Sequence, residues 1–298
     1  MKLGIFYSHP RFEEKKLFEA GENSKKIELI KLKDSELSFD LVHSKKSSNS
    51  TWNEILKCDA VLLRSISHTK NYYLAKVLEA NHKIAINDFH TIAVCGDKFL
   101  TNVKLYENNV PSPRTKLCFS EEAALQTIEE FGYPVVMKPT VGSWGRLLSK
   151  INDREAAESI LEHKKVLGSF LHHTVFYIQE YINKKNGRDI RALVVGNQVV
   201  AAMYRQSAHW ITNTARGGDV QECPITPELK KIVLDAADAV TEKSTRGSLL
   251  GVDVIETENG LKIVEVNSGV EFHGLSEIAD IDIAKTIIDF CTKIMEEM

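Results

Sequence analysis

The chain has 298 residues, of which 43% are hydrophobic and 27% charged, and its formal net charge is −3. This length suits about two domains, or three small ones, and the composition is that of a soluble globular protein with a large core. The charge is not basic and no apolar run reaches membrane-spanning length, so we expect neither nucleic acid nor a membrane as a partner.

The first part of the chain alternates short apolar segments with polar or amphipathic ones. Strands are expected at 3–7, 27–32, 60–64 and 84–87, helices from residue 11 and at 72–80, and a surface loop at the Ser- and Lys-rich stretch 43–51. Such alternation predicts a small α/β domain over residues 1–93.

Two further units follow. A helix at 97–108 and an extended, proline-containing stretch at 110–115 lead into the unit 94–174, with a helix at 120–131, strands at 135–139 and 147–151, and a helix at 153–163. The unit 175–298 contains strands at 175–181, 188–195 and 199–204, a helix at 227–242, a hairpin at 251–267 and an amphipathic helix at 283–297. The predicted class is therefore α/β (α+β).

The cysteines are scattered along the chain. They are Cys58, Cys95, Cys118, Cys223 and Cys291. No CxxC pair is present, and the apolar run at residues 3–7 is short for a signal peptide, so we expect free buried thiols in a cytoplasmic protein.

The hairpin near the C-terminus carries a set of oxygen ligands. Glu265 and Asn267 lie two residues apart on one strand, so their side chains share a face. Asp253 can face them from the partner strand, across a turn at Asn259-Gly260. Two carboxylates and an amide suit Mg²⁺. The alternative is a strand whose acids simply face solvent.

Phosphate-binding residues are expected in the middle of the chain, which lacks a P-loop. Lys138 ends an apolar strand, where a lysine either reaches solvent or points at an anion. The loop that contains Ser143 and Gly145 offers backbone N–H groups, a hydroxyl and the guanidinium of Arg146. By itself such a loop is also consistent with an ordinary turn.

Three more segments combine polar groups with strand ends. Residues 179–182 end a strand with an acid that could read an adenine amino group, residues 187–191 place Asp189 and Arg191 on one face, and residues 213–218 set an amide and an arginine before two glycines. A solvated strand end or a surface loop is the alternative for each.

Taken in order, these segments resemble the ATP-grasp superfamily of carboxylate–amine ligases over essentially the whole chain. The segments are Cys95 to Lys98, Pro111 to Thr115, Tyr133 to Pro139, Gly142 to Arg146, Gln179 to Ile182, Asn213 to Gly218, and Asp253 with Glu265 to Asn267. The resemblance implies an ATP-grasp fold preceded by a small α/β pre-ATP-grasp domain.

A narrower resemblance rests on Ser143 to Leu148 and Ser207 to Gly218, which look like the ligases of amino-group-carrier-protein biosynthesis. These enzymes join the amino group of α-aminoadipate (lysine route) or glutamate (arginine route) to the C-terminal glutamate of a small acidic carrier protein. Lysine-route members carry a His-Thr-type pair after the metal asparagine and then Glu-Phe-Lys-Asn. Here residues 267–274 read NSGVEFHG, which leaves the choice between the two amino acids, or both, open.

The resemblance also implies roles for individual residues, with ATP and Mg²⁺ as cofactors. Asp253, Glu265 and Asn267 would hold the metal, and Arg216, Gly217 and Arg191 would stabilise the oxyanion and the acyl phosphate. The ATP-binding residues would be Lys98, Lys138, Ser143, Gly145, Gln179, Glu180, Ile182, Asp189 and Asn213. The substrate residues would be Arg205, His209, Ser268, Gly269, Glu271 and Phe272.

Both the carrier and the amino acid are acidic, so a basic groove is expected despite the net charge. Charge reversal at Arg205 is predicted to weaken carrier binding and spare ATP binding. His209 is either a proton acceptor or a packed loop histidine. The family suggests a homodimer or homotetramer. Two other hypotheses stay open: a glutamate ligase that acts on a ribosomal protein or a cofactor, and a nucleotide-binding regulator without catalysis.

Overall fold

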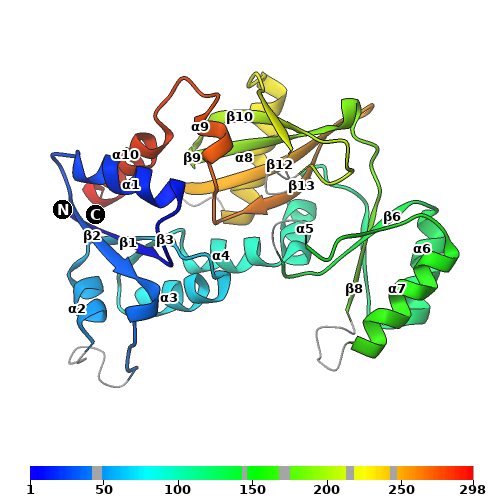
Figure 1. Ribbon diagram of the computed structural model, residues 1–298, viewed down its shortest axis with the longest axis horizontal. Coiled ribbons are helices and arrows are strands. Elements are labelled where there is room, and N and C mark those ends of the chain that lie inside the picture. Colours follow the sequence, from blue (N-terminus) through cyan, green and yellow to red (C-terminus); the bar gives the residue numbers. More distant parts are fainter. Residues whose placement is uncertain (42–48, 143–145, 168–174, 213–217, 242–246, 298) are drawn as a thin grey trace.

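The computed structural model describes residues 1–41, 49–142, 146–167, 175–212, 218–241 and 247–297. Three sheets with helices packed on them form the molecule (Figure 1). Within these residues, no helix combines the length and the apolar character that a membrane span requires.

The N-terminal sheet consists of four parallel strands in the order β2-β1-β3-β4. The strands are β1 (Lys2–Tyr7), β2 (Glu28–Lys33), β3 (Ala60–Arg64) and β4 (Ile84–Ile86), and the helices are α1 (Phe12–Glu22), α2 (Ser50–Lys57) and α3 (His68–Ala80). All five residues of β3 are buried, as a strand of a parallel sheet with both faces covered requires.

Two helices, α4 (Phe89–Gly96) and α5 (Lys98–Glu107), connect this unit to an antiparallel central sheet in the order β5-β8-β6-β7. Its strands are β5 (Thr115–Cys118), β6 (Val135–Lys138), β7 (Ser149–Ile151) and β8 (Phe176–Glu180), and its helices are α6 (Glu121–Phe131) and α7 (Arg154–Leu167). Figure 1 shows both helices on one side of this sheet.

The C-terminal sheet is antiparallel, in the order β11-β10-β9-β12-β13. Its strands are β9 (Arg188–Gly196), β10 (Gln198–Gln206), β11 (Asp219–Glu222), β12 (Ser248–Thr257) and β13 (Gly260–Asn267); the helices are α8 (Pro227–Thr241), α9 (His273–Ser276) and α10 (Ile283–Glu296). The hairpin β12–β13 places Asp253 directly opposite Glu265, as predicted.

Two local predictions differ from the structure. The stretch expected to be a loop as far as residue 51 contains the start of α2, because the Asn49 side chain caps that helix by accepting from the Trp52 N–H at 2.8 Å. The proposed boundary between residues 174 and 175 assigns β8 to the C-terminal unit, whereas β8 pairs with β5 and β6 in the central sheet.

The hydrophobic cores do not correspond one to one with the three sheets. One core combines residues of β1, α1 and β3 with residues of β9, β10 and α10, so it joins the N-terminal and C-terminal sheets. The helix α10 packs beside α1, and the two chain ends lie close together (Figure 1). Another core contains only residues between Cys118 and Ile178, and it belongs to the central unit alone. All five cysteines are buried and free, as expected.

Candidate active site

Two cavities meet beside the C-terminal sheet. The first, about 870 Å³ including its open mouth, lies between the central and C-terminal sheets. The second, about 1490 Å³ on the same basis, lies between the N-terminal and C-terminal sheets. Gly142, Arg205, Asp253 and Glu265 line both. A ligand in one cavity therefore lies next to a ligand in the other at this shared wall.

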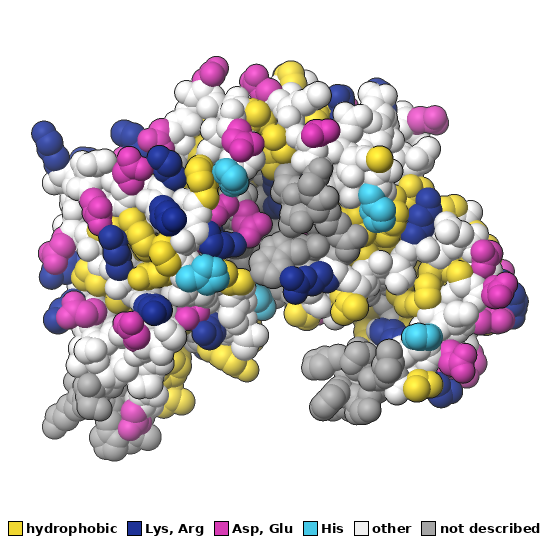
Figure 2. Space-filling view, viewed as in Figure 1, with side chains coloured by type: hydrophobic (Ala, Val, Ile, Leu, Met, Phe, Trp, Pro, Cys, Tyr) yellow, Lys and Arg dark blue, Asp and Glu magenta, His cyan; other side chains and the backbone are white. Residues whose placement is uncertain are grey.

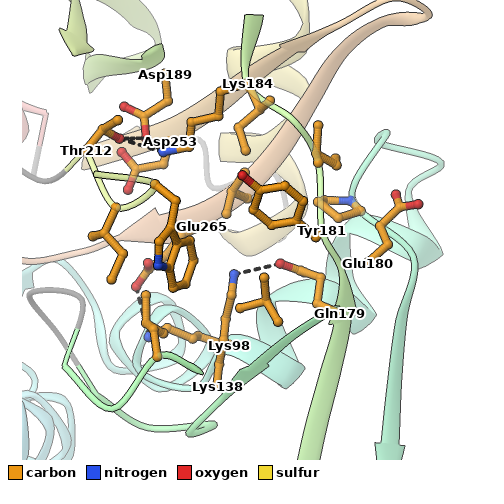
Figure 3. Close-up of a pocket in the computed structure, with 18 of the residues that line it drawn as sticks. Lys98, Lys138, Gln179, Glu180, Tyr181, Lys184, Asp189, Thr212, Asp253 and Glu265 are labelled. Atoms are coloured by element: carbon orange, nitrogen blue, oxygen red, sulfur yellow. Dashed lines mark hydrogen bonds and ion pairs between the residues drawn. The ribbon is translucent and has the colours of Figure 1, made fainter. Parts of the chain in front are cut away.

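Lys98 and Lys138, the two lysines predicted to bind phosphate, both line the first cavity (Figure 3). Lys138, at the end of β6, is 9% exposed and its ammonium donates to the amide oxygen of Gln179 at 2.6 Å. Lys98, at the start of α5, donates to the Gly142 carbonyl at 2.5 Å and lies 3.1 Å from a carboxylate oxygen of Glu265. Burial lowers the pKa of Lys138 to about 8.

A dense polar network surrounds Asp189 on the wall of the first cavity (Figure 3). One of its carboxylate oxygens accepts from Arg205 at 2.8 Å. The other accepts from Lys184 at 3.0 Å and from the Thr212 hydroxyl at 2.5 Å. Burial raises the pKa of Asp189, but Arg205 and Lys184 outweigh it and lower the pKa to about 2. The carboxylate is therefore ionised at neutral pH and fixed in orientation.

The predicted metal residues lie on the hairpin β12–β13. Asp253 and Glu265 line both cavities, and Asn267 lines the second. Asp253 Oδ1 lies 2.8 Å from Arg191 Nε and 3.0 Å from Arg205 Nη2. Although these are ion-pair distances, the oxygen is a buried acceptor without a well-directed hydrogen bond in the described part of the chain. Burial raises the pKa of Asp253, although both arginines act in the opposite direction.

This donor set fits a hard cation that keeps several of its waters. Within the residues described, no three His, Cys, Asp or Glu side chains form a metal-binding cluster. The set instead has two carboxylates and one amide, which leaves positions for waters and substrate phosphates, as Mg²⁺ prefers. Asp253 Oδ1 already lies at ion-pair distance from Arg191 and Arg205, so a cation bound here would share the Asp253 carboxylate with these two arginines.

The end of β8 and the residues after it also line the first cavity, through Gln179, Glu180, Tyr181 and Ile182. The Glu180 carboxylate accepts from the Arg114 N–H at 2.9 Å and pairs with Lys262 at 2.6 Å. Burial raises the pKa of Glu180, but these two contacts lower it overall. Because the carboxylate is already paired, the backbone of this segment is better placed than the Glu180 side chain to read a nucleotide base.

Two of the predicted substrate residues have other roles. Arg205 is 3% exposed and is held by Asp189 and Asp253, so its guanidinium forms part of the shared wall and not a surface that a carrier protein could dock against. The loss of carrier binding on charge reversal at Arg205 stays a prediction, and such a change would also break the ion pairs with Asp189 and Asp253. Phe272 is 1% exposed and packs in the hydrophobic core against Phe12, so it lines neither cavity.

The remaining substrate residues divide between the cavity and the surface. Ser268, Gly269 and Glu271 line the second cavity beside Asn267. His209 is exposed and lines neither cavity; its Nδ1 accepts from the Ile211 N–H at 3.0 Å, which supports the loop-histidine alternative. Five of the predicted residues lie outside the described part of the chain: Ser143, Gly145, Asn213, Arg216 and Gly217.

Several cavity residues were not predicted. Lys184 and Thr212 hold Asp189 in the first cavity, and Arg11 and Arg64 line the second. Lys184 stands five residues before Asp189 in a basic loop, which is a weak signal. Arg11 lies after strand β1 of the N-terminal sheet, and Arg64 ends strand β3. Ligands bind at the carboxyl ends of the strands in parallel α/β sheets, and this position is the one signal in the sequence that could have suggested a ligand site.

Comparison with known proteins agrees with this architecture. A family model described as the RimK-like ATP-grasp domain matches residues 95–291, and one described as the LysX preATP-grasp domain matches residues 3–94. A crystal structure of a RimK domain protein ATP-grasp from Sphaerobacter thermophilus superposes with a TM-score of 0.78 at 24% identity, covering 97% of this chain and 99% of that one.

Curated relatives share more of the sequence. The glutamate–LysW ligase ArgX of Sulfolobus acidocaldarius is 33% identical over 86% of this chain and 89% of its own length. The α-aminoadipate–LysW ligase LysX of Saccharolobus solfataricus is 31% identical over 94% and 97%. A tetrahydromethanopterin:α-L-glutamate ligase of Methanococcus maripaludis is 38% identical over 78% of each chain.

The fold and the paired cavities define an ATP-dependent carboxylate–amine ligase of the ADP-forming type. More particularly, the chain belongs to the RimK-like ATP-grasp family and carries a LysX-type preATP-grasp domain at its N-terminus. The resemblance inferred from the sequence motifs is thereby confirmed.

Proposed function

We propose that this enzyme joins the amino group of α-aminoadipate, glutamate or both to the C-terminal glutamate of a small acidic carrier protein, in lysine or arginine biosynthesis. The relatives named as LysW ligases support this because they align with 86% and 94% of this chain, and the LysX preATP-grasp model matches residues 3–94. The five unpaired, buried cysteines fit a reducing cytoplasm. A homodimer or homotetramer is proposed from the family resemblance alone.

The observation that carries the proposal is the wall shared by the two cavities. A ligase of this class must bring a phosphate donor, a carboxylate and an amine to one point. Asp253 and Glu265 line both cavities. We assign the first cavity to ATP and the second to the carboxylate and the amino acid.

In the first cavity the protein binds and orients the nucleotide. Lys98 and Lys138 hold phosphate oxygens as point charges. The backbone of residues 180–182 reads the adenine, and the network around Asp189 is assigned to the ribose. Asn213 would complete this set. The loop that contains Ser143 and Gly145 is assigned to the phosphates, where it would exclude water that would otherwise hydrolyse the activated intermediate.

Activation comes first in the proposed reaction. The carrier carboxylate attacks the γ-phosphate of ATP, which gives an acyl phosphate and ADP. Mg²⁺, held by Asp253, Glu265 and Asn267, would neutralise charge on the transferring phosphoryl group. Arg191 reaches the shared wall beside Asp253 and is assigned to the acyl phosphate.

Amide formation follows. The free amine of the amino acid attacks the acyl carbon, and phosphate leaves as the tetrahedral oxyanion collapses. Arg216 and Gly217 are the proposed oxyanion donors. The amine loses a proton in this step, and the acceptor for that proton is not assigned, because His209 lies outside both cavities.

The test is the intact mass of the purified carrier after incubation with enzyme, ATP and Mg²⁺, with glutamate and α-aminoadipate in separate tubes. A gain of one amino-acid residue in either tube would support the proposal and assign the route. No gain in either tube would contradict it.

A second candidate function has a specific observation in its favour. The relative with 38% identity is named a tetrahydromethanopterin:α-L-glutamate ligase. The same two-cavity arrangement would serve a cofactor carboxylate in place of a carrier protein. If ATP is consumed with glutamate and a glutamylated cofactor forms while the carrier stays unmodified, this second function replaces the first.

A further inference from the structure

The second cavity has a basic wall supplied by the N-terminal sheet. Arg64 ends β3, and Arg11 lies after β1 at the start of α1. The strand order β2-β1-β3-β4 sends the connection after β1 to one side and the connection after β3 to the other. The crevice at the carboxyl ends of β1 and β3 is therefore a topological switch point, where α/β sheets bind ligands.

The two arginines are fixed differently. Arg64 is 4% exposed; its guanidinium donates twice to Glu14, at 3.2 and 3.0 Å, and once to the Val270 carbonyl at 2.5 Å. Arg11 is held on one side by the same Glu14, with Nε 3.1 Å from Oε2. Its Nη1 donates at 2.6 Å to Glu271, whose side chain is 42% exposed. Arg64 is therefore buried in the wall, whereas Arg11 has a partner that can move away.

The Arg11–Glu271 pair joins the N-terminal unit to the segment that follows the hairpin β12–β13. Three N–H groups of Arg11 are engaged by Glu14 and Glu271, out of the five that a guanidinium carries. Burial lowers the pKa of Arg11, but Glu14 and Glu271 outweigh it and raise the pKa overall. An ion pair between partly exposed groups is weak, so Glu271 can be exchanged for another carboxylate at little cost.

The cavity thus has two cationic regions with different partners. Arg191 and Arg205 lie at the shared wall, where Asp253 holds them beside the proposed metal site. Arg11 and Arg64 belong to the opposite unit. Figure 2 shows basic and acidic side chains gathered on the face where the N-terminal unit meets the C-terminal sheet. Arg11 lines the same cavity as Arg191 and Glu265, so a ligand at the shared wall and Arg11 share one enclosed space.

We propose that Arg11 binds the side-chain carboxylate of the acidic amino-acid substrate, and that Glu271 occupies this guanidinium until the substrate displaces it. Arg64 is a positioning residue, because it fixes Glu14, which in turn orients Arg11. A guanidinium presents a planar fork that matches a carboxylate and does not match a neutral amide equally well. This inference rests on the proposed function, since it assigns the amino acid to the second cavity.

The experiment compares glutamate with its neutral isostere glutamine as the amino-acid substrate. In the wild-type enzyme we expect kcat/KM for glutamate to exceed that for glutamine by about a hundredfold or more, since the loss of a charged hydrogen-bond partner is strongly penalised. In Arg11→Gln this preference should fall by about tenfold or more, mainly through KM for glutamate, while KM values for ATP and the carrier stay within about twofold. Arg11→Lys should restore part of the preference.

The matched control is Lys26→Gln, which breaks the ion pair between Lys26 and Glu296 on the surface away from the cavity. It should leave the preference unchanged. Glu271→Gln removes the competing carboxylate and should lower KM for glutamate. An unchanged preference in Arg11→Gln, an equal loss for both amino acids, or an altered KM for the carrier alone would overturn the proposal.

Failure of the proposed function can be told apart from failure of this inference. If the wild-type enzyme modifies no carrier, glutamate binding to the enzyme with a non-hydrolysable ATP analogue is measured by calorimetry for the wild type and Arg11→Gln. If Arg11→Gln binds glutamate about tenfold or more weakly than the wild type, as expected for a lost charged contact, the role of Arg11 is supported whichever acceptor the enzyme uses. Equal affinity would overturn it.

Discussion

Lys138 and Gln179 face each other from the neighbouring strands β6 and β8, with the Lys138 ammonium 2.6 Å from the amide oxygen of Gln179. The amide nitrogen of Gln179 donates at 3.0 Å both to the Thr115 hydroxyl and to the Tyr177 hydroxyl, so the amide cannot turn over. The partner of this buried lysine is therefore neutral. Its positive charge stays available to an anion in the first cavity, which is what a phosphate site requires.

The first prediction concerns the charge of Lys138. Its pKa of about 8 in the folded state lies below the ordinary 10.5, so the unfolded chain holds the proton more tightly between these pH values. Below pH 8 the buried charge destabilises the fold by about 3 kcal/mol, and this cost disappears as pH rises to 10.5. Lys138→Met has no such charge, so its unfolding free energy minus that of the wild type should fall by about 3 kcal/mol between pH 7 and pH 10.5, because the wild type gains stability over this range.

Lys138→Met should also weaken ATP binding by roughly tenfold to a hundredfold at pH 7, since a charged hydrogen bond to phosphate is lost. Urea denaturation and calorimetric titration measure the two effects. The control is Lys116→Met, a half-buried lysine of β5 that pairs with Glu130 and lines neither cavity. A pH-independent stability difference in Lys138→Met would contradict the assignment of a lowered pKa.

The second prediction concerns Glu265. Its carboxylate is partly exposed and paired with Lys98, so Glu265→Ala should leave the protein folded. Turnover should fall by about a hundredfold or more, because a metal ligand at the phosphoryl group is lost. The control is Glu256→Ala in the same hairpin, which removes only a pair with Arg188 outside both cavities. Comparable activity in the two variants would remove Glu265 from the proposed metal site.

The third prediction concerns the buried ion pairs of Arg205. Arg205→Met leaves Asp189 and Asp253 without their shared guanidinium, and we expect a loss of about 3–5 kcal/mol in the free energy of unfolding at pH 7. The pKa of Asp189 is lowered to about 2, so its stabilisation is present above about pH 4 and is lost as pH falls toward 2. The difference between variant and wild type should therefore shrink in acid.

Arg188→Met provides the comparison for Arg205. It breaks a partly exposed pair with Glu256 and a stacking contact with Tyr204, so it should cost only about 1 kcal/mol. If Arg205→Met were no more costly than Arg188→Met, the buried network would not be the stabilising unit that its distances indicate.

The fourth prediction concerns Asn87, which links the N-terminal and C-terminal units. Its side chain donates to the carbonyls of Leu249 and Ser268, at 2.8 and 3.1 Å, and accepts from the Leu249 N–H at 2.8 Å. Asn87→Ala should lower the free energy of unfolding by about 2–4 kcal/mol, because buried backbone groups lose their hydrogen bonds. Since Ser268 lines the second cavity, KM for the amino acid should rise while KM for ATP stays nearly constant.

The comparison for Asn87 is Asn81→Ala, which loses one local hydrogen bond to the Val77 carbonyl in α3. It should cost about 1 kcal/mol or less and leave both KM values unchanged. Thermal unfolding and steady-state kinetics measure these effects. Equal destabilisation by both substitutions would show that the link between the units contributes little.

The sequence predicted those parts of the site that depend on local pattern. The strand period placed Glu265 and Asn267 on one face, and the turn at residues 259–260 predicted the hairpin; Asp253 lies directly opposite Glu265 because the register shifts between Asp253 and Val254. Lys138 was identifiable because a charged residue is anomalous at the end of an apolar strand. These inferences need only short-range geometry, and the hairpin and strand are where they were expected.

The sequence did not predict contacts that depend on packing between units. Arg205 follows an apolar run and precedes Gln206 at the end of β10, a pattern that suits a solvated strand end, and only the assembled sheet shows that Asp189 and Asp253 enclose it. Arg11 and Glu271 are 260 residues apart in the chain. No periodicity relates them, since their contact arises where the N-terminal unit packs on the segment after β13.

The division of the hydrophobic cores has a consequence for motion. Since one core joins the N-terminal and C-terminal sheets, we expect these two to move together as a single body. Among the described residues the central sheet shares no core with the other two sheets, so it is the part that we expect to rotate against the rest. The first cavity lies across this hinge, whereas most of the second lies within the rigid pair. Nucleotide exchange should therefore follow the opening rate of the central sheet, while the sheets that enclose the amino-acid pocket stay together and only side chains such as Glu271 change partner.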